Sequence, residues 1–285
     1  MKNIKITIVV ENTASMEGLL AEHGLSVWIE TPNANILFDT GQGPALPQNA
    51  AALKIPLERA NAIVLSHGHY DHTGGLPHAL ERAPKAKVFL HPEAFAPRFS
   101  IRDTIMRAIN MPYPAEGALI SHSGNIVHTA KSMEVVPGVW VTGAIPRRNK
   151  YEDTGGPFFL DKLGLKPDPI PDDQALWLDT ADGTVVVLGC AHAGVVNTLE
   201  YISELSGASE YFAVMGGMHL ARATVKRLGK TAEALERFHV KQIAAGHCTG
   251  ANAIEFLARH LPGRMIPCAA GSVFAFDGSA RQNGP

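Results

Sequence analysis

The chain has few cysteines, no long hydrophobic run and no concentration of basic residues. Its cysteines, Cys190, Cys248 and Cys268, are an odd set without close spacing. That pattern argues against a disulfide framework and favours a reducing compartment. No apolar stretch approaches the length of a membrane span, and the run from Ile6 to Val10 is too short for a secretory signal and ends at Glu11. We therefore expect a soluble, cytoplasmic protein.

The charges are nearly balanced, with 25 Lys and Arg against 27 Asp and Glu and a formal net charge of -2. Binding to nucleic acid needs clustered basic side chains, so we expect no nucleic-acid partner. One short basic cluster, Arg147, Arg148 and Lys150, is large enough to hold a single anionic group but not a duplex. A small molecule is therefore the expected partner, and nothing in the sequence specifies the oligomeric state.

The order of the predicted elements indicates a single α/β domain spanning residues 1–285. Three strands with antiparallel character come first, at residues 4–10, 25–31 and 35–39, and strands and helices alternate later in the chain. Ala-Asp-Gly at 181–183 predicts a hairpin between strands at 175–180 and 184–189. The stretch at about 92–173 is rich in Pro and Gly, and we interpret it as a lid or substrate-binding insertion, the alternative being a solvated connection.

A cluster of four potential metal ligands follows the apolar strand 62–65. His67, His69, Asp71 and His72 lie within six residues in the segment Ser-His-Gly-His-Tyr-Asp-His. Side chains alternate along an extended segment, so the first three can project to one side, whereas His72 breaks the alternation and suits a second ion. Imidazole and carboxylate ligands favour zinc, iron, manganese or nickel over copper(I).

Three later histidines share one context, because His192, His219 and His247 each follow an apolar strand and lie beside a glycine. Open α/β sheets place their sites at such strand ends, so these histidines can reach the first cluster. Cys190 and Cys248 lie beside them; each is most simply a small buried residue, with a secondary metal or redox role left open.

Asp39 ends a strand in Phe-Asp-Thr-Gly-Gln-Gly. Its carboxylate either caps that turn or orients a ligating histidine through the ring nitrogen that does not face the metal.

These motifs resemble the metallo-β-lactamase superfamily, whose signature is His-x-His-x-Asp-His and whose fold is a four-layer αββα sandwich. Asp39, His192 and His247 match its other motifs in order, and the similarity spans about residues 1 to 276. Finer features are similar to a branch named after a dihydropterin ribofuranosyl-aminobenzene phosphate synthase, namely Phe-Asp-Thr-Gly, Thr-Gly-x-Ile-Pro-Arg, Gly-Cys-Ala-His-Ala-Gly, Gly-Gly-x-His-Leu and Gly-His-Cys-Thr-Gly.

The resemblance implies two divalent ions, zinc first, with manganese, iron or nickel as alternatives. One ion would be held by His67, His69 and His192, and the other by Asp71, His72 and His247. The superfamily usually carries a bridging Asp where this chain has Gly216-Gly217-Met218-His219. We therefore expect water or hydroxide to be the main bridge and one ion site to be weaker, with His219 as a ligand, an acid or a substrate-binding group.

By the same resemblance, the protein would be a metal-dependent hydrolase or phosphate-processing enzyme for a small anionic, pterin-like molecule, using a metal-bound hydroxide. Asp71 would orient the nucleophile and His219 would protonate the leaving group. Substrate contacts are predicted at Arg147, Phe158 and Phe159. The alternatives are an iron-dependent oxidoreductase on the same fold and a non-catalytic small-molecule sensor.

Overall fold

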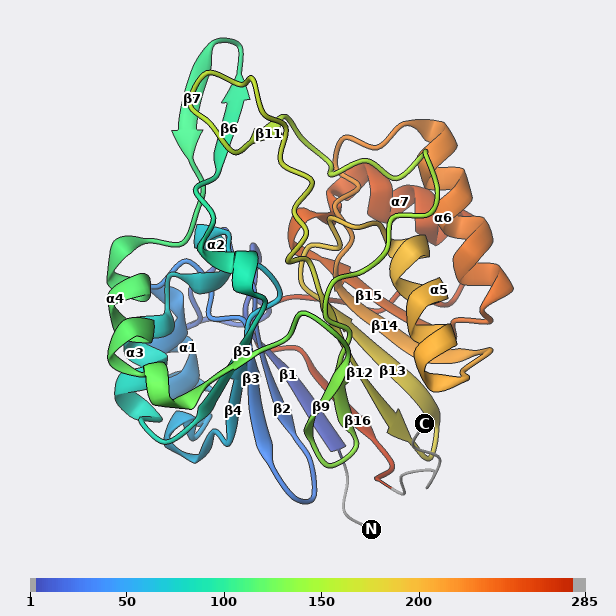
Figure 1. Ribbon diagram of the computed structural model, residues 1–285. Coiled ribbons are helices and arrows are strands. Elements are labelled where there is room, and N and C mark those ends of the chain that lie inside the picture. The colour runs from blue at the N-terminus through green and yellow to red at the C-terminus, as the bar shows by residue number, and fades with distance from the viewer. Residues whose placement is uncertain (1–3, 279–285) are drawn as a thin grey trace.

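The computed structural model describes residues 4–278, so both ends of the predicted domain, 1–3 and 279–285, lie outside the described residues. Two β-sheets face each other in the middle of the molecule, and helices cover the outer face of each sheet (Figure 1). The predicted four-layer αββα sandwich is confirmed. Within the described residues, no helix has the length and apolar character needed to cross a membrane.

The first sheet has seven strands in the order β16-β1-β2-β3-β4-β5-β8. Pairing is antiparallel from β16 to β3 and parallel from β3 to β8. The strands are β1 (Ile4–Val10), β2 (Ser26–Glu30), β3 (Asn35–Phe38), β4 (Ala62–Val64), β5 (Lys87–Leu90), β8 (Ile126–His128) and β16 (Val273–Phe276). The three strands expected at the start of the chain are therefore consecutive neighbours in this sheet.

The second sheet has six strands in the order β15-β14-β13-β12-β10-β9. Its hairpin of β12 and β13 turns at the predicted Ala-Asp-Gly, and β13, β14 and β15 then run parallel. The strands are β9 (Met133–Val136), β10 (Val139–Val141), β12 (Ala175–Thr180), β13 (Gly183–Leu188), β14 (Tyr211–Gly217) and β15 (Gln242–Gly246).

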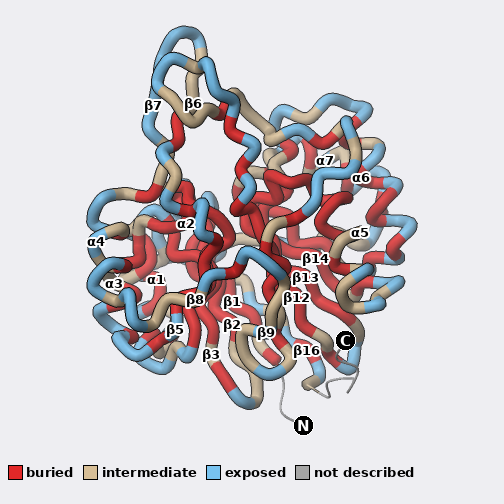
Figure 2. Tube along the Cα trace, in the orientation of Figure 1, coloured by how far each residue is buried: buried red, intermediate tan, exposed pale blue. Residues whose placement is uncertain are grey.

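Three apolar clusters hold these layers together, and the buried residues follow the sheets and the inner faces of the helices (Figure 2). Alternating strand residues such as Ile8, Phe38 and Val187 fill the space between the sheets. The opposite strand faces pack against α1 (Ala45–Ala52), α3 (Leu76–Arg82) and α4 (Tyr113–Ser121) on one side and α5 (Val195–Ser206), α6 (Val225–Arg237) and α7 (Ala251–His260) on the other.

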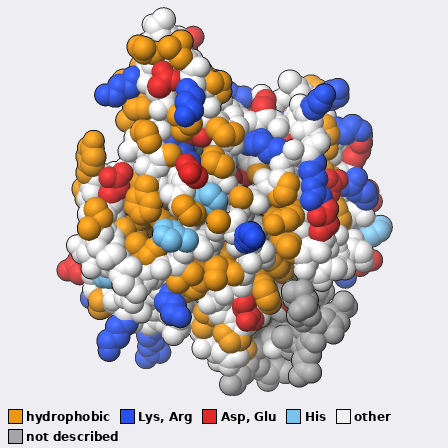
Figure 3. Space-filling view, in the orientation of Figure 1, with side chains coloured by type: hydrophobic (Ala, Val, Ile, Leu, Met, Phe, Trp, Pro, Cys, Tyr) orange, Lys and Arg blue, Asp and Glu red, His pale blue; other side chains and the backbone are white. Residues whose placement is uncertain are grey.

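The stretch at 92–173 is more regular than its composition indicates. Strands β8, β9 and β10 belong to the two main sheets, whereas β6 (Phe99–Arg102), β7 (Ile105–Ala108) and β11 (Phe158–Phe159) form a small third sheet. This third sheet, here called the arm, projects beyond the sandwich (Figure 1), and in Figure 3 hydrophobic and basic side chains gather on it. Whether it acts as a lid stays a prediction.

The turn of the arm explains why the sequence did not reveal its hairpin. Asp103 and Thr104 connect β6 to β7, and both have positive φ angles, 48° and 68°. Such a two-residue turn normally carries Asn-Gly or Asp-Gly, because glycine adopts positive φ without strain. A hairpin closed by Asp-Thr therefore lacks the usual local signal.

Candidate metal centre

The candidate ligands meet at one end of the sandwich, where strands of both sheets stop. His67 follows β4 in the first sheet, while His192, His219 and His247 follow β13, β14 and β15 in the second. Parallel strands deliver their carboxyl ends to the same edge, so residues far apart in sequence converge there. The structure thus brings together all seven residues predicted as ligands, although His219 lies to one side of the rest.

The loop that carries the first cluster is not extended throughout. His69 has an extended backbone, but a single helical turn, α2 (Tyr70–Thr73), begins directly after it. Asp71 and His72 therefore project from a helical turn, and strand alternation does not account for the position of Asp71. The turn places Asp71 and His72 toward β15, while His67 and His69 face His192.

His67, His69 and His192 form one group, in which one ligand atom from each lies within 4.8 Å of the others. The Nε2 atoms of His69 and His192 are buried and have no hydrogen-bond partner in the protein. His192 donates its Nδ1 proton to the carbonyl oxygen of Thr154 at 2.8 Å, which leaves the Nε2 lone pair free. Unpartnered buried imidazole nitrogens that converge in this way fit a divalent ion.

Burial has the effect on these three histidines that metal binding requires. It lowers the pKa of His67, His69 and His192 well below the usual range, and repulsion adds to the effect, from Arg98 first in the case of His69 and from neighbouring histidines in all three. The rings are neutral at physiological pH as a result, and the neutral imidazole is the form that ligates a metal.

Asp71, His72 and His247 form the second group. Oδ2 of Asp71 lies 3.7 Å from Nε2 of His72 and 3.4 Å from Nε2 of His247, and these two nitrogens are 3.2 Å apart. His23, which the sequence did not single out, approaches the same carboxylate oxygen at 3.2 Å. Burial raises the pKa of Asp71, but His72, His23 and His247 outweigh it and hold the pKa well below its usual range.

Asp39 lies directly behind His72. Its carboxylate accepts hydrogen bonds from the backbone N–H and hydroxyl of Ser66, both at 2.7 Å, and from Nδ1 of His72 at 2.7 Å. These contacts fix the His72 ring with Nε2 directed toward Asp71 and His247. Burial would lower the pKa of His72, yet Asp39 and Asp71 raise it to about 9.

A comparable arrangement holds His247. Glu11 accepts a hydrogen bond from its backbone N–H, and Oδ1 of Asn12 lies 3.0 Å from its Nδ1 atom. The backbone of His247 has a positive φ angle, 51°, as do Asp39 and His219 at 57° and 46°. Strained backbone of this kind persists where surrounding contacts over-determine it, and here it occurs at several residues of one site.

A buried cluster of one arginine and two aspartates supports the loop between His67 and His69. Arg98 donates to Asp168 at 2.8 Å and to both carboxylate oxygens of Asp172 at 2.8 and 2.5 Å, and Asp172 accepts from the backbone N–H of Gly68 at 2.7 Å. A Cβ atom at Gly68 would lie 2.0 Å from a backbone oxygen, so the loop packs here only with glycine. Because Arg98 directly precedes β6, this cluster also anchors the base of the arm.

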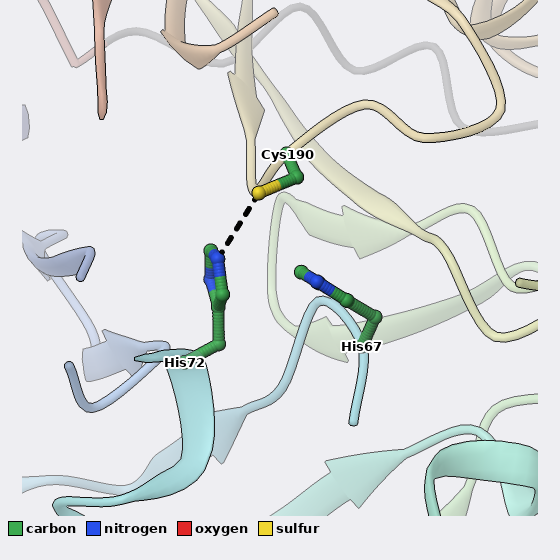
Figure 4. A group of neighbouring side chains, drawn as sticks. All are labelled: His67, His72 and Cys190. Carbon is green, nitrogen blue, oxygen red and sulfur yellow. Dashed lines mark hydrogen bonds between the residues drawn. The ribbon is translucent and has the colours of Figure 1, made fainter. Parts of the chain in front are cut away.

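The thiol of Cys190 directly contacts a candidate ligand, which its role as a small buried residue would not require. Its Sγ atom is 3.1 Å from Nε2 of His72 and is directed toward the space between His72 and His67 (Figure 4). Cys248 lies near it and accepts a hydrogen bond at 3.3 Å from the backbone N–H of His219. The side chains that the sequence left open thus stand among the candidate ligands.

His219 lies against the outer side of His192, with ring centroids 4.3 Å apart. Its Nδ1 atom is buried without a hydrogen-bond partner. Gly155 covers the ring so closely that a Cβ atom there would lie 1.9 Å from Cδ2 of His219. The glycine-containing segment at 153–156 therefore holds His219 in place.

A cavity of about 610 Å³ opens above the candidate ligands. This volume is typical of small-molecule sites. Its base includes His69, Asp71, His192, His219 and His247, and its walls include Tyr70, Phe158, Arg102, Arg107 and Arg222.

Two predicted substrate residues lie elsewhere. Arg147 does not line this cavity, because its guanidinium donates to the carbonyl oxygens of Glu152, Pro169 and His192. Phe159 is also outside the cavity, since neighbouring residues on β11 face opposite sides and Phe158 takes the inner position. The arginines of the arm were not foreseen, because their place depends on a hairpin that the sequence did not reveal.

Buried histidines and a carboxylate gathered at the ends of two facing sheets define an αββα protein with a candidate metal centre. The chain belongs to the metallo-β-lactamase superfamily, whose family model matches residues 20–221. The branch indicated by the finer motifs is also borne out by sequence similarity. A curated relative from Methanocaldococcus jannaschii, 7,8-dihydropterin-6-methyl-4-(β-D-ribofuranosyl)-aminobenzene-5'-phosphate synthase, is 30% identical and aligns over 96% of this chain and 97% of its own.

Solved structures show the same fold. A metal-dependent hydrolase of the β-lactamase superfamily matches with a TM-score of 0.81 and 27% identity, covering 95% of this chain and 98% of its own. A diphosphatase of the PhnP family matches with a TM-score of 0.53 at 15% identity, covering 97% and 98% of the two chains, a similarity of fold alone.

Proposed function

We propose that the protein is a metal-dependent hydrolase that acts on a small phosphate-bearing molecule. The observation that carries the proposal is a single cavity with unpartnered imidazole nitrogens at its base and three arginines on its walls. The base suits activation of water, and the walls suit an anion.

We propose that two sets of side chains hold divalent ions, the sets that the resemblance implies, and that His72 releases its Nε2 proton when the ion binds. His67, His69 and His192 would hold one ion, and Asp71, His72 and His247 the other. Divalent ions in such a site make water acidic enough to supply hydroxide at neutral pH and polarise the bond that is attacked. Zinc suits the imidazole-rich set best, with manganese, iron and nickel as alternatives.

The protein's own groups complete the chemistry. Asp71 is ionised at neutral pH and lines the cavity, so it can accept a hydrogen bond from the attacking water and orient it. His219 lines the cavity from the opposite side, and we assign it the proton donated to the leaving group. Phe158 packs edgewise on His192 and His219, with centroids 5.4 and 5.9 Å away, and keeps water from their apolar side.

The three arginines of the wall outnumber the one carboxylate that lies beside them in the cavity lining, that of Asp103. Arg102, Arg107 and Arg222 form no ion pair with any residue of the described part of the chain. Partial burial lowers the pKa of Arg102, and repulsion from Arg222 and Arg107 lowers it further, against a smaller opposite effect of Asp103. A phosphate group would satisfy these guanidinium groups, since their geometry matches phosphate oxygens.

The rest of the substrate would lie between the arm and the base, where Tyr70 and Phe158 supply aromatic surface. The relative from Methanocaldococcus jannaschii is named for a product that joins a pterin to a ribofuranosyl phosphate. We propose a substrate of that general kind, with a flat heteroaromatic part and a phosphate. The arm, within the 92–173 insertion, would cover it, in a soluble protein whose three free thiols suit the cytoplasm.

A substrate panel on purified protein tests the proposal. Protein stripped with a chelator is reloaded with zinc, manganese or iron(II) and assayed on nitrophenyl phosphate monoesters and diesters and on a nitrophenyl carboxylic ester. We expect metal-dependent hydrolysis that favours the phosphates. Turnover that requires both iron and dioxygen, without hydrolysis by the zinc-loaded protein, would instead support an oxidoreductase.

A further inference from the structure

By the resemblance, a bridging carboxylate is expected in the segment Gly216-Gly217-Met218-His219, and two of its four residues, Gly216 and Gly217, have no room for a side chain. Gly216 has a φ angle of 110°, and a Cβ atom there would lie 2.1 Å from the carbonyl oxygen of Leu188. A Cβ atom at Gly217 would lie 2.5 Å from the carbonyl oxygen of Gly189 and 2.7 Å from Sγ of Cys248. Backbone and a thiol fill the space that a carboxylate would need.

Cys190 occupies the region between the two groups of ligands. Its Sγ atom lies within 4.8 Å of ligand atoms of His67 and His72, and likewise of His192 and His219, and of His247 and Cys248. His67 and His192 belong to the first predicted ion, whereas His72 and His247 belong to the second. Cys190 is thus placed with members of both sets, and it occurs in three of the five groups of possible ligands found among the described residues.

We propose that the Cys190 thiolate is a metal ligand shared by the two halves of the centre, in place of the missing carboxylate. The inference rests on the proposed function only in requiring that the protein bind a metal. It replaces our expectation that water or hydroxide is the main bridge between the two ions. A sulfur ligand also narrows the choice of metal, because thiolates favour zinc, cobalt and iron over magnesium or manganese.

When a metal binds to Cys190, one proton is released. The Cys190 S–H bond breaks, the sulfur lone pair forms the bond to the metal, and the proton passes to the solvent. Cys190 is only 3% exposed, so its thiolate would be costly without a cation beside it. His67, His69 and His192 are neutral imidazoles, and a thiolate would supply the negative charge that these three ligands lack.

Cys248 provides a matched control. It is a neighbouring thiol, but its Sγ atom accepts a hydrogen bond from the backbone N–H of His219, and its only ligand group consists of Cys190, His247 and itself. It therefore stands with the second set of ligands and not with His67. A sulfur ligand from Cys190 and one from Cys248 can be told apart by substituting each in turn.

The first experiment uses the wild-type protein loaded with zinc and examined by X-ray absorption. We expect a sulfur scatterer at about 2.3 Å from the metal together with nitrogen and oxygen scatterers. A first coordination sphere fitted by nitrogen and oxygen alone would overturn the inference. Because no substitution is involved, this result does not depend on a variant folding.

The second experiment compares C190S and C248S after loading with cobalt(II), with circular dichroism to check folding. The near-ultraviolet band from sulfur to cobalt should be present in wild type and C248S and absent from C190S. The wild type should also release one more proton per molecule on metal binding than C190S. A band retained in C190S, or lost only in C248S, would assign the sulfur to another residue and overturn the inference.

These outcomes separate the two proposals. Failure of the wild-type protein to bind any divalent ion would overturn both the metal-dependent function and the Cys190 ligand. Binding of metal with hydrolysis, but without a sulfur ligand, would overturn only the second.

Discussion

The base of the cavity and the arm above it are built in opposite ways. At the base, the six principal candidate ligands are between 0% and 7% exposed, and carboxylate, amide or carbonyl groups fix several of their rings. On the arm, Ile105 and Met106 are 59% and 41% exposed, and Arg102 and Arg107 form no ion pair within residues 4–278.

Under the proposed function, this difference would separate metal chemistry at the base from substrate recognition at the arm. Metal chemistry depends on ligand positions that tolerate little movement, so the base needs buried partners for each ring. Recognition of a substrate tolerates exposed and mobile side chains, because their contacts form when the ligand binds. Substitutions should therefore be severe at the base, intermediate where the arm joins it and mild at the tip of the arm.

The largest effect is expected for H69A. His69 supplies a buried ring nitrogen without a protein partner, so its loss removes a ligand that no nearby group replaces. Bound metal, measured by elemental analysis, should fall by about one equivalent or more, and hydrolysis should fall to background. H128A, which removes an exposed histidine on β8, should retain both. Full metal content in H69A would contradict the assigned ligand set.

The next largest effect is expected on protein stability, for a substitution of Arg98. This residue lies where the arm joins the base of the cavity. R98A leaves the carboxylates of Asp168 and Asp172 buried without their partner, which should lower the free energy of unfolding by about 3–5 kcal/mol. R259A removes an exposed pair with Glu255 and should cost about 0.3–0.5 kcal/mol. Urea unfolding measures both, and similar losses in the two variants would contradict the anchoring role.

D39N should weaken metal binding without removing a ligand. Asn cannot replace the charged acceptor for both Ser66 and His72, so the His72 ring loses its fixed orientation. Losses of this kind reduce metal affinity or activity by about 10- to 100-fold. Metal titration in competition with a chelator provides the measurement, with D277N, an exposed carboxylate near the end of β16, as the control. Unchanged metal affinity in D39N would show that the Asp39 carboxylate only caps its turn.

R102Q should affect substrate binding more than the chemical step. Loss of one guanidinium contact to a phosphate should raise KM for a phosphate ester by about tenfold. The value of kcat should stay within about a factor of two to three of the wild-type value, because an interaction made equally before and during the reaction changes KM alone. K85Q, an exposed substitution between α3 and β5, should change neither. A fall in kcat with no change in KM would place Arg102 in the chemistry.

The smallest effect is expected at the tip of the arm. I105S replaces an exposed side chain, so the free energy of unfolding should change by less than about 0.5 kcal/mol. Metal content should be unchanged, while relative rates on substrates with different aromatic groups should shift if the arm covers the substrate. A loss of several kcal/mol in thermal or urea unfolding would show that the arm supports the sandwich.

Local patterns predicted a single α/β domain and the base of the cavity, whereas the prediction of the αββα sandwich came from the resemblance to the metallo-β-lactamase superfamily. Apolar strands that end in His and Gly identify the sites of His67, His192 and His247 without knowledge of how the strands pack. The alternation of side chains along an extended segment did not account for the position of Asp71, because Asp71 lies in a helical turn that residue spacing alone does not reveal.

The walls of the cavity were not predictable in this way. Arg147 lies in a basic cluster and attracted attention, yet tertiary packing uses it to bind carbonyl oxygens. Arg102 has no distinctive sequence context and reaches the cavity because a hairpin with an unusual turn folds over it. The central place of Cys190 likewise depends on how two sheets meet, which no local pattern records.

The meeting of ligands from two sheets has a consequence for folding. His67 and His69 follow a strand of the first sheet, whereas His192 and His247 follow strands of the second. An ion bound by ligands from both sheets would therefore cross-link the two halves of the sandwich. An ion that binds only the folded chain stabilises it in proportion to the logarithm of its free concentration. The supply of metal would then govern how long the protein lasts as well as how fast it works.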